Sequence, residues 1–79
     1  LNIYLVTLAS NGKDLFDILP SHLLKQKALR RNLPMIVGIA VGYEEAVDLV
    51  VGIVEETIRK TGGTDVRQYL KDKLEKEGS

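Results

Sequence analysis

Residues 34–63 read PMIVGIAVGYEEAVDLVVGIVEETIRKTGG, and this stretch decides the fold that the sequence predicts. Its first part, residues 35–41, is a continuous apolar run rich in β-branched side chains, which is typical of a strand covered on both faces. The run is far too short to cross a membrane. After a turn at Gly42, one long helix is expected, ending at Gly62 and Gly63.

This helix carries more apolar side chains than one sheet face can cover. Placed at 100° per residue, they span an arc of about 200°, whereas a helix that packs on one surface needs about 100°. We therefore expect part of the arc to form an interface with another molecule. The candidate interface residues are Tyr43, Val47, Leu49, Val50, Val51, Val54 and Ile58.

The chain has 79 residues, which is the length of one small domain, expected over residues 1–77 with Gly78 and Ser79 as a disordered tail. A domain of this size buries only about 60% of its unfolded surface, and oligomerisation commonly compensates. There are no cysteines, which excludes disulfides and thiolate metal sites. With no signal peptide or membrane span recognised, the expected compartment is the cytoplasm.

The net charge of zero hides two halves of opposite sign. Residues 1–42 carry five basic and two acidic side chains, a net charge of +3, and the remainder carries six basic and nine acidic, a net charge of −3. Such halves permit pairing within the chain or between copies, and they argue against a globally basic nucleic-acid binder.

The first part of the chain predicts a central strand over residues 2–9, apolar on both faces, and a turn over residues 10–13. Residues 15–19 fit either a hairpin strand or a helical turn ended by Pro20, and we favour the short helix or irregular segment. Ser21 is expected to cap a helix that continues to about Asn32.

These elements predict an α/β fold, a small domain of two or three layers in the order β-α-β-α-α with parallel strands joined by a right-handed crossover. The alternative is an α+β fold in which residues from Leu15 to Leu19 add a hairpin strand. The last helix, capped by Thr64 or Asp65, should dock through a narrow apolar stripe. That stripe comprises Val66, Tyr69, Leu70 and Leu74.

No pattern of catalytic residues emerges, so we expect neither enzymatic activity nor a bound cofactor or metal. Residues 7–14 do not match a phosphate-binding loop, because Thr7 stands where glycine is required and Asp14 where a hydroxyl is required. His22, the only histidine, lacks a nucleophile and an orienting carboxylate in any recognised arrangement.

The leading functional hypothesis is a non-enzymatic interaction or regulatory module that acts as a homodimer. A nucleic-acid-binding regulator is the first alternative, because four positive charges fall within residues 25–31 and could contact phosphates. They belong to Lys25, Lys27, Arg30 and Arg31. Binding of a small molecule at a subunit interface is the second alternative.

Overall fold

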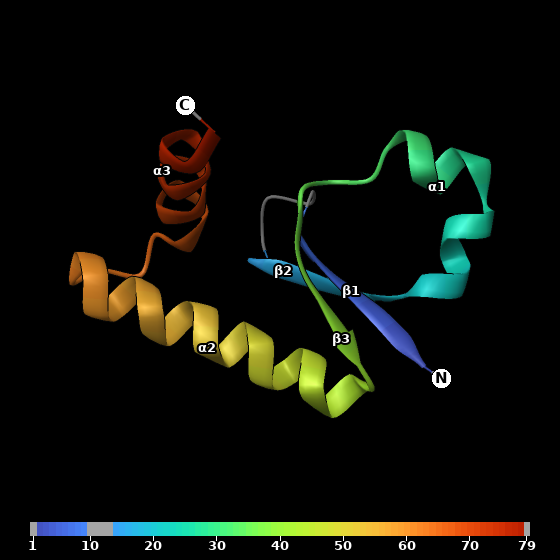
Figure 1. Ribbon diagram of the computed structural model, residues 1–79, viewed down its shortest axis with the longest axis horizontal. Helices are drawn as coiled ribbons and strands as arrows, with labels where there is room; N and C mark the ends of the chain where they lie inside the picture. Colours follow the sequence, from blue (N-terminus) through green and yellow to red (C-terminus); the bar gives the residue numbers. More distant parts are fainter. Residues whose placement is uncertain (1, 10–13, 79) are drawn as a thin grey trace.

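The computed structural model describes residues 2–9 and 14–78. Three strands come first to last as β1 (Ile3–Leu8), β2 (Phe16–Pro20) and β3 (Ile36–Val41). The connection from β2 to β3 contains two short helical segments, η1 (Ser21–Lys25) and α1 (Lys27–Arg31). Two longer helices, α2 (Tyr43–Thr61) and α3 (Val66–Gly78), follow β3 (Figure 1).

The sheet has the order β2-β1-β3, and β1 runs antiparallel to both neighbours. The prediction of a parallel α/β sheet is therefore wrong, and the fold is α+β. Residues 15–19 fall largely in β2, so the short helix that we favoured there is also wrong, whereas the hairpin alternative matches. The turn predicted at residues 10–13 and Ser79 of the predicted tail lie outside the described residues.

A parallel arrangement of the first two strands requires a crossover that begins at the end of β1. Instead, the chain reverses direction in the hairpin and the crossover starts only after Pro20. It connects β2 with β3, which run in the same direction on opposite sides of β1. A crossover is needed for strands of equal direction, and here it spans the central strand.

The central position predicted for β1 is confirmed, and Leu5, Val6, Thr7 and Leu8 are all buried. Alternate residues of β1 bond to different neighbours, as an antiparallel ladder requires. The amide of Ala9 donates to the carbonyl of Leu15 beside β2, and the amide of Gly42 donates to the carbonyl of Asn2 beside β3. Odd-numbered residues of β1 therefore bond toward β2, and its even-numbered residues bond toward β3.

Helix α2 covers one face of the sheet and lies mainly over β3 and β1. Gly42 joins it to β3 with φ 90° and ψ 152°, a region that is essentially restricted to glycine. The predicted end at Gly62 is confirmed by its left-handed conformation, φ 75°. Gly38 of β3 leaves room for Leu49, whose Cδ1 lies 2.6 Å from where a Cβ at Gly38 would stand.

Helix α3 docks at the far end of the same layer, where Leu8, Val66 and Leu70 form a buried cluster. One cap predicted for it is confirmed, because the amide of Gln68 donates to Asp65 Oδ1 at 3.2 Å. The guanidinium of Arg67 donates to the carbonyl of Ala9 at 3.0 Å and so ties α3 to the end of β1. The last residue of the predicted stripe, Leu74, is exposed.

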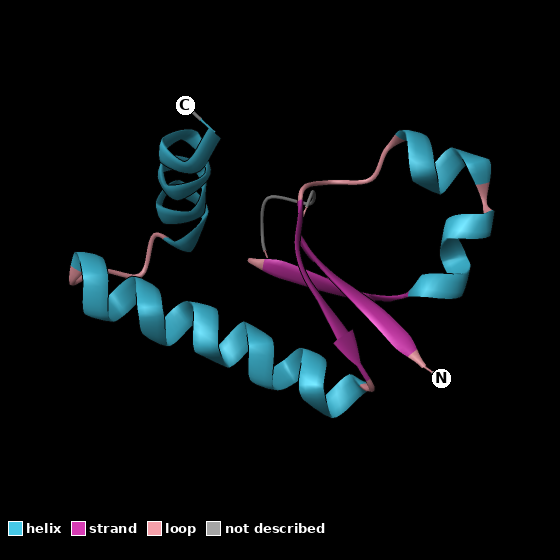
Figure 2. Cartoon of the chain, viewed as in Figure 1, coloured by secondary structure: helices cyan, strands magenta, loops and turns pink. Residues whose placement is uncertain are grey.

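The segment between β2 and β3 lies across the strands from α2 (Figure 2). The single helix predicted for residues 21–32 is wrong, because Gln26 has extended dihedral angles, φ −78° and ψ 117°, and separates η1 from α1. Ser21 is not its cap either, since Pro20 holds that position without a side-chain hydrogen bond. None of the helices within residues 2–9 and 14–78 is long and apolar enough to cross a membrane.

Candidate functional site

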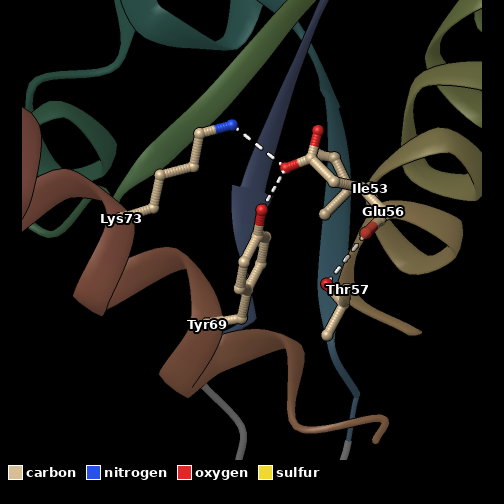
Figure 3. A network of polar contacts seen from close by, with 5 residues as sticks. All are labelled: Ile53, Glu56, Thr57, Tyr69 and Lys73. Carbon is tan, nitrogen blue, oxygen red and sulfur yellow. Dashed lines mark hydrogen bonds and ion pairs between the residues drawn. The ribbon is translucent and has the colours of Figure 1, made fainter. Parts of the chain in front are cut away.

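The most connected polar group in the described part of the chain joins α2 to α3. The hydroxyl of Tyr69 donates to Glu56 Oε2 at 2.7 Å, and the Lys73 ammonium donates to the same oxygen at 3.0 Å. Figure 3 shows both α3 side chains directed at the carboxylate from the facing helix. One carboxylate oxygen thus fixes the spacing of two helices.

The electrostatics of this group are those of a structural contact. The hydrogen bond from Tyr69, followed by that from Lys73, holds the pKa of Glu56 below its usual 4.5. The same contacts raise the pKa of Tyr69 and the pKa of Lys73. A nucleophilic lysine or an acidic tyrosine requires a lowered pKa, whereas both shifts here are upward.

An open groove of about 690 Å³ runs beside this group between α2 and α3. Its lining carries both signs of charge, with two carboxylates, Glu56 and Asp72, and three lysines, Lys60, Lys73 and Lys76. Asp72 accepts a hydrogen bond from Gln68 at 2.8 Å.

The interface residues predicted on α2 divide into two sets. Leu49, Val50 and Val54 are half-buried and pack on the core clusters. Tyr43, Val47, Val51 and Ile58 are exposed and define a surface that we call the α2 flank. Tyr43 is 56% exposed even though its ring meets that of Tyr4 edge to face, with centroids 5.7 Å apart.

A second apolar surface lies on β3, at the opposite face of the sheet. Ile39 and Val41 are paired with Leu5 and Ile3 of β1, and residues opposite each other share a face. Leu5 is buried, but Ile39 is 63% exposed and Val41 is 54% exposed. The prediction that this strand is covered on both faces is therefore wrong for Ile39 and Val41, which we call the outer part of β3.

The basic residues predicted as nucleic-acid contacts are exposed but do not share one helix face. They fall in η1 and α1, on either side of the break at Gln26. Arg30 is engaged with its own segment, because its Nη1 donates to the carbonyl of Leu24 at 2.8 Å. Lys25 thus lies on η1, and Lys27, Arg30 and Arg31 lie on α1, so the four residues do not belong to one helix.

His22 is exposed in η1 and lines a small hollow of about 230 Å³ with Tyr4 and Pro20. No group of three or more histidine, aspartate or glutamate side chains suited to a metal ion occurs in the described ranges. Comparison with protein-family models, with curated proteins and with solved structures finds no match to this chain.

Sequence reasoning did not find two of these features. The contacts of Glu56 with Tyr69 and Lys73 join residues 13 and 17 positions apart on different helices, so no local spacing signals them. The exposure of β3 has a signal in the sequence, the absence of charge from this strand, but the signal is ambiguous. An apolar strand free of charge is expected both in the middle of a sheet and at an edge that associates.

Proposed function

We propose that this domain is a non-enzymatic interaction module that acts as a homodimer in the cytoplasm. The observation that carries the proposal is the apolar surface left exposed by the fold. It comprises the α2 flank, whose residues recur at helical spacing along α2, and the outer part of β3, with Ile39 and Val41 at alternate positions of one strand. Contiguous exposed apolar patches are typical of protein–protein interfaces.

A small domain gains stability from such association, because burying apolar surface contributes about 25 cal/mol per Å². The described core is small and consists largely of short side chains, including Ala9, Ala40 and Ala46. Helix α3 contributes Val66 and Leu70 to it, with Tyr69 packed against them. Association between copies would extend this core.

The polar group at Glu56 supports a non-enzymatic role, since its contacts stabilise the charged carboxylate and ammonium and the neutral phenol. All three partners are thereby kept in their resting protonation states. These contacts support a role for the group in orienting α3 against α2.

The test is the mass of the full chain in solution, measured by light scattering behind a sizing column at low micromolar concentration. We expect the mass of two copies, with dissociation on dilution. A chain that elutes with the mass of one copy, 8.8 kDa, throughout this range would refute the proposal.

A further inference from the structure

We infer that the second copy docks on the free edge of β3, so that two three-stranded sheets join as one continuous antiparallel sheet. The inference rests on the proposed homodimer and names the surface through which it forms. Its first support is the backbone of β3. From Gly38 onward, even-numbered residues of this strand bond toward β1, so the amide and carbonyl groups of Ile39 and Val41 point away from the sheet.

Within the described ranges, these outward groups of Ile39 and Val41 have no backbone hydrogen-bond partner. An exposed row of unpaired backbone groups is a template for another strand. Together with the exposed side chains of the same two residues, it provides both the bonds and the apolar contact that a docking strand needs.

The two edges of the sheet differ in how they are protected. β2 carries the charge of Asp17 and ends at Pro20, which has no amide hydrogen, and both features discourage the pairing of edges. β3 reads IVGIAV and contains no charge and no proline, and the irregularity in its pairing lies opposite Val6 and Thr7, before Ile39. The less protected edge is therefore the one that also exposes Ile39 and Val41.

The charges around β3 favour a second copy in antiparallel orientation. Arg30 and Arg31 precede the strand, and Glu44 and Glu45 follow it, all four exposed. When β3 pairs antiparallel with itself, the basic end of each copy lies beside the acidic end of the other. A parallel pair would place like charges together, so complementarity selects the two-fold symmetric arrangement.

Bonded pairs must use outward groups. We place Ile39 of one copy opposite Val41 of the second, and Val41 opposite Ile39, because this alignment pairs both outward residues of each copy. The two-fold axis then passes beside Ala40, whose buried side chain points to the α2 layer. Both α2 helices lie on the same face of the joined sheet, and the side chains of Ile39 and Val41 pack together on the other face.

Hydrogen exchange of the full chain, followed by NMR at a concentration where light scattering gives two copies, tests the inference. We expect the amides of Ile39 and Val41 to exchange at least about 100-fold more slowly than unprotected amides, approaching the inward amide of Ala40. Rapid exchange of both amides in a chain that is dimeric overturns the edge-strand inference and leaves the proposed function standing. A monomeric chain refutes the proposed function itself.

Three lysine variants at exposed positions provide the matched comparison. Ile39→Lys should weaken the dimer at least about tenfold, because two like charges meet beside the axis. Ile3→Lys adds the same charge to the same face on the central strand, and Val51→Lys adds it to the α2 flank. Ile3→Lys should change the affinity less than about twofold. Dissociation by Val51→Lys, with Ile39→Lys still dimeric, overturns the inference in favour of the α2 flank.

Discussion

Replacing Gly38 with alanine tests how closely α2 approaches β3. A Cβ at this position would stand 2.6 Å from Leu49 Cδ1, 2.8 Å from Cδ2 and 3.2 Å from Cγ. Carbon atoms in favourable contact are about 3.5–4.0 Å apart. Since both methyl groups and the carbon that bears them are approached, the whole leucine side chain must move.

The magnitude follows from two opposing effects. Overpacking of a core contact costs about 1–3 kcal/mol. Alanine in a strand regains about 0.5–1 kcal/mol relative to glycine, because less conformational freedom is lost on folding. We therefore expect Gly38→Ala to lower the free energy of unfolding by about 1–2 kcal/mol, which for a domain of this size lowers Tm by roughly 5–15 °C.

Urea denaturation followed by circular dichroism, at one fixed protein concentration, measures this change. The partner variant is Leu49→Ala, which removes the atoms that the new Cβ would meet. In that background Gly38→Ala should become neutral or stabilising by up to about 1 kcal/mol, giving a coupling energy of roughly 1–3 kcal/mol. If Gly38→Ala costs the same in both backgrounds, the contact with Leu49 is not the reason for glycine and the reasoning fails.

Three further predictions concern buried hydroxyls, a carboxylate and a turn. Thr7→Val should raise the free energy of unfolding by about 1 kcal/mol in urea denaturation, because the fully buried Thr7 hydroxyl has no hydrogen-bond partner among the described residues. Thr57→Val should bring no such gain, since the Thr57 hydroxyl donates to the Ile53 carbonyl at 2.9 Å; equal gains would contradict this account. Because the pKa of Glu56 is lower in the folded chain than its usual 4.5, the charged carboxylate stabilises the fold at pH values above the unfolded pKa. This stabilisation is lost as the pH falls through the lower pKa of the folded state. Glu56→Gln should accordingly lower Tm at about pH 7 and lose this effect toward about pH 3, unlike the exposed control Glu55→Gln. Gly42→Ala should cost about 1–3 kcal/mol in the same denaturation assay, because alanine is strained at φ 90°, and an unchanged midpoint would argue against this turn geometry.

The parts of the fold that were predicted correctly have local signals. Helix α2 was recognisable from its apolar period, the acidic residues of its first turn and Gly62 after its last turn, all of which lie within one stretch. Asp65 and the pair Val66 and Leu70 marked α3 in the same way. These signals depend on residues up to four positions apart, and the helices that they predict are present in the structure.

The direction of the strands had no such signal. Residues 15–19 are short enough to suit a strand or a helical turn, and only pairing with β1 decides between them. That pairing places Phe16 and Ile18 opposite Leu8 and Val6, where both pack on the core. Once β2 exists, the direction of β3 relative to β1 is reversed, so one undecided segment changed the whole topology.

The candidate surface was only half predictable for a related reason. The width of the apolar arc on α2 correctly indicated more apolar surface than the fold covers, but it did not indicate where α2 would lie on the sheet. Because Leu49 packs against Gly38, the part of the apolar arc left uncovered is the α2 flank with Tyr43, Val47 and Val51. The free edge of β3 depended on the strand order and could not be read from spacing.

The strand order also has a consequence for synthesis on the ribosome. The first strand made is the central one, so β1 can form its hairpin with β2 early, yet its other side stays unpaired until β3 has emerged. A nascent chain halted after the hairpin forms and before β3 emerges would expose an apolar strand edge without a hydrogen-bond partner to other chains. Translation through residues 21–41 is thus the interval in which this polypeptide is most exposed to aggregation, and the one in which a chaperone would help it most.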